Sequence, residues 1–162
     1  MRNLVDGLGL SWRDVYQTDD KAEVEAFCSR NGIDFEWKGD HHLQITWVKP
    51  AIYEHPHTGE KLWFNHGFFF NAQTMSKEVR EVFKDESELP FNTYYGDGSF
   101  IEEEVIEEIR ECFEKAKVQF SWQQGDLLLM DNMLMAHGRN SFEGERKILV
   151  AMSNPYSATK VH

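Results

Sequence analysis

The sequence has little positive charge and no long apolar run. Lys and Arg number 17 against 28 Asp and Glu, so the formal net charge is -11. A nucleic acid or an anionic membrane binds clustered cations that replace its counterions, so this composition argues against both partners. The sequence shows no basic-then-apolar leader and no uncharged stretch of membrane-spanning length. These features predict a cytoplasmic protein without a membrane partner.

Cysteine is also scarce. Cys28 and Cys112 are the two cysteines, and they lie far apart in the sequence. They provide neither a disulfide framework nor a metal-binding spacing. Both fall on the apolar faces of predicted helices, so we expect buried free thiols.

Length and composition fit one folded domain over residues 1–162. A chain of 162 residues that is 41% hydrophobic and 14% aromatic can fill one core. It is too short for two domains of ordinary size. No internal repeat or linker divides it.

Helical signals occur at three places. The sequence Thr18-Asp19-Asp20 can cap a helix that ends at Asn31-Gly32, with Ala22, Ala26 and Phe27 on one side. Ser76 can cap a short helix, and Ser99 with Glu102 can form a capping box for a third. We expect the second helix to turn Val79, Val82 and Phe83 inward, and the third to bury Val105, Ile109, Cys112, Phe113 and Ala116.

Strand-like patterns fill much of the rest. Residues 43–48 alternate with period two, and His55-Pro-His-Thr-Gly59-Glu60 is a turn between two extended runs that form a hairpin. Residues 92–98 suggest an ordered loop. After the last helix, strand-like runs cover residues 118–122, 127–130, 133–136 and 148–152. This order predicts a fold that is mainly β with α insertions, either a β-sandwich or a jelly roll.

The stretch from Trp122 to Lys147 carries the most distinctive chemistry. A predicted apolar strand delivers His137 to the protein interior or a cleft, and Arg146 follows nine positions later. This order suits a metal beside an anionic co-substrate. Both residues also have a structural interpretation, because a histidine after an apolar strand is commonly a hydrogen-bonded core residue and Arg146 can be a surface charge.

Other candidate residues have structural interpretations of the same kind. Gly125-Asp126 and Asp131-Asn132 are typical turn residues. The Phe68–Phe70 cluster is core or an aromatic wall around a small-molecule pocket. His55, His57 and His66 lack the spacing of a zinc site.

The order of these residues resembles a known family. Its C-terminal signature is matched by Trp122, Gly125-Asp126, Asp131-Asn132, His137-Gly138-Arg139, Phe142, Gly144 and Arg146. The family is that of the taurine dioxygenase (TauD/TfdA-like) oxygenases, which depend on Fe(II) and 2-oxoglutarate and share the clavaminate synthase-like fold. Residues 55–60 and 63–65 resemble its central hairpin, and residues 92–98 resemble the branch of syringomycin and nonribosomal-peptide biosynthesis.

The resemblance implies roles for individual residues. His137 stands at the position of the distal iron ligand. Arg146 matches the arginine that binds the distal carboxylate of 2-oxoglutarate, and Arg139 is the weaker alternative. Asn65, Phe68 and Tyr94 are candidates for the substrate pocket. The implied substrate is a small molecule or a carrier-bound amino acid.

One family motif is absent from the sequence. None of the histidines begins a His-x-Asp or His-x-Glu pair, which supplies the other two iron ligands in the family. We therefore expect the C-terminal part of an oxygenase: a partial double-stranded β-helix (jelly roll) that lacks the N-terminal strands and does not bind iron tightly or turn over alone. Two alternatives stay open, a non-catalytic binding or assembly module of the same fold and an enzyme completed in trans. Exposed strand edges would favour a homo-oligomer.

Overall fold

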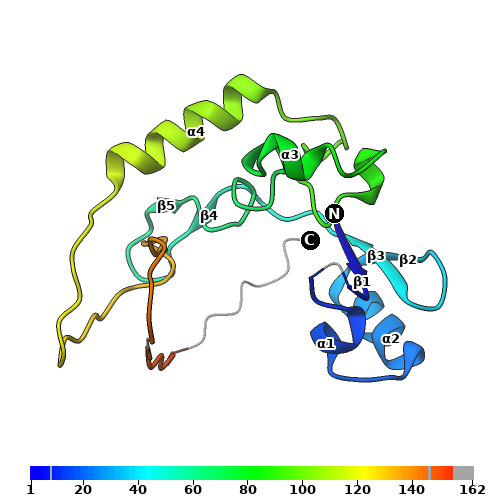
Figure 1. Ribbon diagram of the computed structural model, residues 1–162, viewed down its shortest axis with the longest axis horizontal. Helices are drawn as coiled ribbons and strands as arrows, with labels where there is room; N and C mark the ends of the chain where they lie inside the picture. Colours follow the sequence, from blue (N-terminus) through cyan, green and yellow to red (C-terminus); the bar gives the residue numbers. More distant parts are fainter. Residues whose placement is uncertain (8, 146, 155–162) are drawn as a thin grey trace.

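The computed structural model describes residues 1–7, 9–145 and 147–154. In chain order the elements are β1 (Arg2–Val5), α1 (Trp12–Tyr16), α2 (Lys21–Asn31), β2 (Asp34–Trp37), β3 (His42–Thr46), β4 (Tyr53–Glu54), β5 (Lys61–Leu62), the 3-10 helix η1 (Ala72–Thr74), α3 (Lys77–Arg80), the 3-10 helix η2 (Glu86–Glu88) and α4 (Glu103–Ala116). Figure 1 shows β1 to β3 with α1 and α2 as one lobe, set apart from α4. We call residues 2–47 the N-terminal lobe and residues 117–154 the C-terminal segment.

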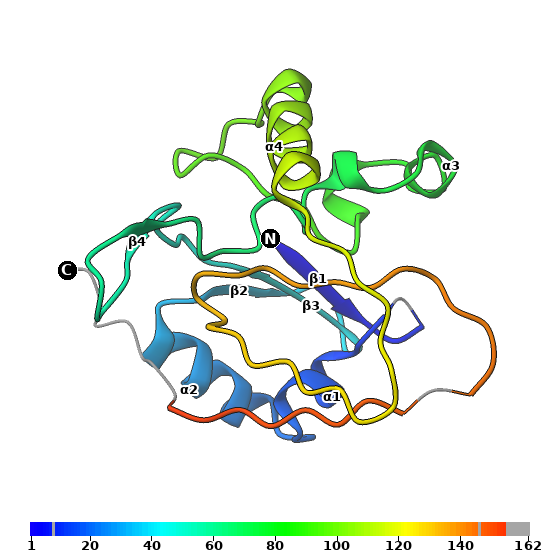
Figure 2. The same cartoon turned by 90° about the vertical axis from the view of Figure 1, so that its left-hand side faces the viewer.

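The N-terminal lobe is built on a three-stranded antiparallel sheet. Its strand order is β1-β3-β2, with Leu43 of the central strand opposite Leu4 on one side and Trp37 on the other. Figure 2 shows α1 and α2 lying together on one side of this sheet. The core between the helices and the sheet is formed by Leu4, Trp12, Val24, Cys28, Leu43 and Ile45.

Local capping sets the ends of the two helices in this lobe. Ser11 and Asp14 form a reciprocal capping box at the start of α1. Asp20 accepts a hydrogen bond from the Ala22 N–H at the start of α2, and Gly32 ends it with a φ of 62°. The predicted bounds of α2 are therefore confirmed, because its caps are encoded locally.

The predicted faces of the helices were less accurate. α2 buries Val24 and Cys28, whereas Phe27 is exposed. Cys28 is a buried free thiol as expected, but Cys112 is exposed. In α2 the sheet lies against the side that carries Val24 and Cys28, and the sequence alone did not identify that side.

The middle of the chain contains the predicted hairpin and two of the predicted helices. β4 and β5 pair in antiparallel fashion around the 55–60 turn. Ser76 caps α3 as expected, but Val79 and Val82 are exposed. α4 has no side-chain cap, because Ser99 bonds Asp97 instead of forming the expected capping box. The ordered loop is confirmed by a Tyr95 N–H to Ser99 carbonyl bond of 2.9 Å.

The C-terminal segment departs most from expectation. None of the four predicted strands forms there, and the described residues of the segment contain no helix either. Leu127 and Leu129 are 93% and 94% exposed. A strand needs a neighbouring strand for its backbone hydrogen bonds, and nothing in the described part of the chain pairs with these runs.

The fold-class prediction is confirmed only in part, because more of the described residues lie in helices than in strands. Small antiparallel sheets with helical insertions are present, and the described residues form no closed barrel or sandwich. The β content is lower than predicted because the C-terminal runs are unpaired. In the parts that the structure describes, no helix has the length and apolar character to cross a membrane.

Candidate functional site

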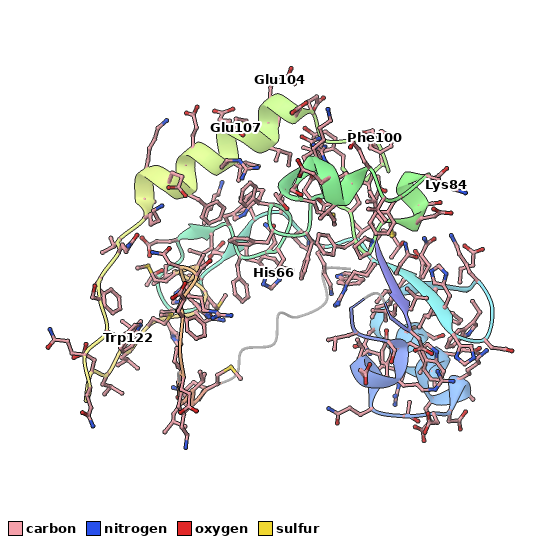
Figure 3. The ribbon with its side chains drawn as sticks, viewed as in Figure 1. His66, Lys84, Phe100, Glu104, Glu107 and Trp122 are labelled. Atoms are coloured by element: carbon pink, nitrogen blue, oxygen red, sulfur yellow. The ribbon has the colours of Figure 1, made fainter. Side chains whose placement is uncertain are left out.

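The predicted metal ligand and its neighbours lie on the C-terminal segment. His137 is exposed and follows a turn at residues 132–134, not the predicted strand, so its ring is not delivered into the interior. Arg139 is also exposed, and its guanidinium lies 4.8 Å from the centroid of the Phe142 ring. Arg146 lies outside the described residues. Trp122, at the start of the motif, lies on the run that leaves the end of α4, far from the N-terminal lobe (Figure 3).

Two of the predicted pocket residues stabilise local structure. Asn65 donates to the Ala51 carbonyl at 2.7 Å and accepts the Gly67 N–H at 2.6 Å. Phe68 is buried and stacks on Phe113 of α4 with 5.3 Å between ring centroids. Asn65 thus holds the backbone after β5 through its hydrogen bonds, and Phe68 packs this region against α4.

Tyr94, the third predicted pocket residue, lies at the ordered loop. It is half-buried and forms an isolated antiparallel bridge with Phe100. Its ring centroid lies 5.5 Å from that of Phe100. His137 is on a different segment, so the predicted pocket and metal residues come from separate parts of the chain.

A pocket lies elsewhere, between η1, α3 and the loop before α4. Its volume is about 420 Å³, and its lining includes Gln73, Arg80, Lys84 and Ile101. None of the predicted site residues that the structure describes lines it. This pocket is therefore not the predicted oxygenase site.

A buried histidine makes a contact that sequence reasoning missed. His55 is only 4% exposed, and its Nε2 lies 3.0 Å from Asp131 Oδ2. Its Nδ1 accepts backbone N–H groups from Thr58 at 3.1 Å and His57 at 3.3 Å. Because Nδ1 is an acceptor, the neutral ring carries its proton on Nε2 and donates it to Asp131.

Asp131 in turn organises the turn before His137. Its Oδ1 accepts the Met133 N–H at 2.8 Å and the Leu134 N–H at 3.4 Å. The Met133 N–H, followed by the His55 hydrogen bond, lowers the pKa of this carboxyl below its ordinary value. Both residues belong to the motifs that resemble the family, which was the available signal for a contact between them.

The described residues do not fit a complete iron site. A non-haem ferrous site of this type needs two histidines and a carboxylate. Among the residues that the structure describes, no group of three or more His, Cys, Asp or Glu side chains could hold a metal ion. His137 alone cannot hold Fe(II) specifically, so further ligands are required.

Comparison with known proteins supports the family resemblance. The model of the family "Taurine catabolism dioxygenase TauD, TfdA family" matches residues 10–152. The dapdiamide synthesis protein DdaC of Enterobacter agglomerans is 39% identical over 158 residues, which is 96% of this chain and 48% of DdaC. A clavaminate synthase-like protein of Arabidopsis thaliana is 26% identical over 148 residues, which is 90% of this chain and 42% of that protein. The chain thus spans about half the length of these relatives.

Proposed function

Because the chain belongs to the taurine catabolism dioxygenase TauD, TfdA family, an oxygenase-type family, we propose that it forms one side of an Fe(II)- and 2-oxoglutarate-dependent oxygenase site. His137 is the proposed iron ligand, and Arg146 is the proposed partner of the 2-oxoglutarate carboxylate. The observation that carries the proposal is the order His137, Arg139 and Arg146 inside the span that the family model matches.

The side-chain chemistry supports these roles. A neutral imidazole is a common ligand of ferrous iron. A guanidinium can donate two parallel hydrogen bonds to a carboxylate, whereas lysine acts as a point charge. Arg139 remains the alternative, but its position over the Phe142 ring occupies one face of its guanidinium.

The proposed activity needs ligands from outside these 162 residues. The sequence contains no His-x-Asp or His-x-Glu pair, and no metal-binding group is found among the described residues. We propose that the chain alone does not turn over, and that an H-x-D/E segment completes the site on the same or another polypeptide.

The proposed substrate class is a small molecule or a carrier-bound amino acid. The name of DdaC assigns that relative to dapdiamide synthesis, which supports a biosynthetic role on a small molecule. We further propose a cytoplasmic location. The net charge of -11 supports the absence of a nucleic-acid partner.

Exposed apolar side chains favour an additional role in assembly. Val118, Leu127 and Leu149 are each more than four-fifths exposed on the C-terminal segment. Apolar surface of this kind favours association, so we propose a homo-oligomer in which the segment contributes to the interface. Sedimentation equilibrium tests it: the expected result is a concentration-dependent mass above that of one chain, and a monomer at all concentrations contradicts it.

An anaerobic titration with ferrous iron and 2-oxoglutarate tests the proposed site. The chain alone is expected to show no saturable binding at micromolar concentrations. Mixing it with the part of a family relative that carries the H-x-D/E motif is expected to create a 1:1 site. His137→Ala is expected to abolish that site, and the exposed His57→Ala is the matched control that leaves it intact. A site that survives His137→Ala contradicts the assignment.

A second pair of variants separates the two arginines. In the completed site, Arg146→Lys is expected to weaken 2-oxoglutarate binding about tenfold or more, because the bidentate contact is lost. Arg139→Lys is the control and is expected to change binding by about twofold or less. The reverse order would reassign the co-substrate contact to Arg139.

A further inference from the structure

The contact between His55 and Asp131 joins two parts of the chain that are 76 positions apart. His55 lies directly after β4, in the turn of the β4–β5 hairpin. Asp131 lies on the C-terminal segment, six positions before His137. Figure 1 shows the orange part of this segment passing beside the hairpin.

The hairpin holds the His55 ring in one orientation. The His55 N–H donates to the Glu60 carbonyl at 2.8 Å, and the Gly59 N–H donates to the His55 carbonyl at 2.9 Å. Two further N–H groups, from His57 and Thr58, point at Nδ1. This arrangement leaves Nε2–H as the free donor of the ring and fixes its direction.

One oxygen of the Asp131 carboxylate accepts the Nε2–H of His55, and the other accepts hydrogen bonds from the turn that follows Asp131. Oδ2 faces His55 Nε2, while Oδ1 accepts the N–H groups of Met133 and Leu134. The Asp131 carbonyl also accepts the Met135 N–H at 3.0 Å. The carboxylate therefore connects the hairpin to the turn that leads to His137.

We propose that His55 and Asp131 are a positioning pair, in which the Nε2–H tautomer of His55 anchors the Asp131 turn and thereby orients the segment that carries His137. The significance for His137 rests on the proposed function, but the pair itself does not. Neither residue is a proposed metal ligand. Sequence reasoning gave Asp131 only the role of a turn residue and found no zinc-site spacing for His55.

Two substitutions of His55 separate the donor role of Nε2–H from the acceptor role of Nδ1. His55→Gln keeps an N–H donor near the Nε2 position and loses the Nδ1 acceptor. His55→Asn keeps an acceptor near the Nδ1 position and loses the donor to Asp131. Asp131→Asn keeps one oxygen for the turn and replaces the other with an amide N–H₂, which cannot accept the His55 proton.

The test is nuclear magnetic resonance of the 162-residue chain. Long-range nitrogen–proton spectra are expected to show His55 as the neutral Nε2–H tautomer. In His55→Asn, amide exchange at Met133 and Leu134 is expected to rise about fivefold, as for loss of one partly exposed hydrogen bond. His55→Gln is expected to stay within about twofold of the parent. Asp131→Asn is expected to cause a smaller rise when added to His55→Asn than when made in the parent, because the contact with His55 is already lost.

The Gly59 amide is the internal control for folding. Its exchange is expected to stay constant in every variant whose hairpin is intact. A His55 protonated on Nδ1, a His55→Asn with unchanged exchange at Met133 and Leu134, or a His55→Gln as disruptive as His55→Asn would each overturn the proposal.

His137→Ala keeps this test separate from the proposed function. That variant is expected to leave the His55 signals unchanged. A failed iron titration therefore leaves the positioning pair standing, and a failed tautomer assignment leaves the roles of His137 and Arg146 standing. In the proposal the His55–Asp131 pair orients His137, and His137 does not orient the pair. A change in the His55 tautomer caused by His137→Ala would therefore contradict it.

Discussion

The N-terminal lobe and the C-terminal segment differ in where their apolar side chains lie. In the lobe, Trp12, Leu43 and Cys28 are fully buried between a sheet and two helices. In the segment, Leu127 and Leu129 are almost fully exposed, and the described residues of the segment contain no strand. Of these two regions, only the lobe therefore has a buried apolar core among its described residues, while the proposed chemistry resides in the segment.

This difference has a physical origin. The lobe contains all three strands of its sheet, β1, β2 and β3, so the strands find their backbone partners within the lobe itself. The segment has four strand-like runs that find none among the described residues. The family motif of His137 thus lies on a part of the chain whose order depends on contacts from elsewhere, such as the His55–Asp131 contact.

The largest expected difference between the lobe and the segment is in the rate of backbone amide exchange. Amides of Leu43 and Ile45 in the central strand are expected to exchange at least a thousandfold more slowly than those of residues 127–130, because only the former have strand partners. Hydrogen exchange on the dilute chain measures this. A rise in protection of the segment with concentration would report the proposed homo-oligomer, whereas equal protection in the dilute chain would remove the distinction between the regions.

The next contrast compares two tryptophans. Trp12→Ala removes a fully buried ring from the lobe core and is expected to lower the free energy of unfolding by about 3–5 kcal/mol. Trp122→Ala, on the segment, is expected to change it by less than about 0.5 kcal/mol. Urea unfolding of both variants provides the measurement, and equal losses would contradict the account.

Two asparagines extend the comparison to buried polar groups. Asn3 is 3% exposed and donates to the carbonyls of Ser87 and Leu89 at 2.7 and 2.6 Å. Asn3→Ala is expected to lower the free energy of unfolding by about 2 kcal/mol, because these acceptors lose their donor. Asn140→Ala, at an exposed position of the segment, is the matched control and is expected to have no measurable effect on urea unfolding.

The smallest expected effect is a pH dependence at the start of α1. Hydrogen bonds from the Ser11 side chain and backbone lower the pKa of the Asp14 carboxyl. Its folded pKa is below its unfolded value, so its contribution to stability is present above the unfolded pKa and is lost as pH falls through the folded pKa. Asp14→Asn is expected to lower the midpoint of thermal unfolding at neutral pH, with the difference vanishing in acid.

Asp131→Asn sharpens this last comparison. The pKa of the Asp131 carboxyl is also lowered, first by the Met133 N–H and then by His55. Its hydrogen bonds hold a turn of the segment, so the variant is expected to leave the unfolding midpoint of the lobe unchanged at all pH values. A midpoint shift as large as that of Asp14→Asn would show that the segment shares in global stability.

Local signals in the sequence predicted several features that local physics controls, although the expected capping box of Ser99 and Glu102 does not form. The ends of α2 followed from Asp20 and Gly32, and the hairpin followed from the proline and glycine of its turn. Buried faces were harder, because the sides of α2 and α3 that are covered depend on what packs there. Phe27 and Val82 are exposed for that reason.

The remaining wrong or missed predictions concern contacts between residues that are far apart in the sequence. The strands expected after α4 have the right composition but no pairing partner in the described chain. The His55–Asp131 contact spans 76 positions, and no periodicity reports such a contact. The expected burial of His137 at a strand end was wrong, because the apolar run before it has no pairing partner among the described residues.

The central claim is that this chain supplies one side of an oxygenase site and needs ligands from outside it. The most direct measurement is the affinity for ferrous iron in the presence of 2-oxoglutarate, for the 162-residue chain alone and for the chain completed by an H-x-D/E segment. The account predicts no saturable site on the chain alone and a 1:1 site on the completed protein that His137→Ala abolishes. A tight 1:1 site on the chain alone would contradict it.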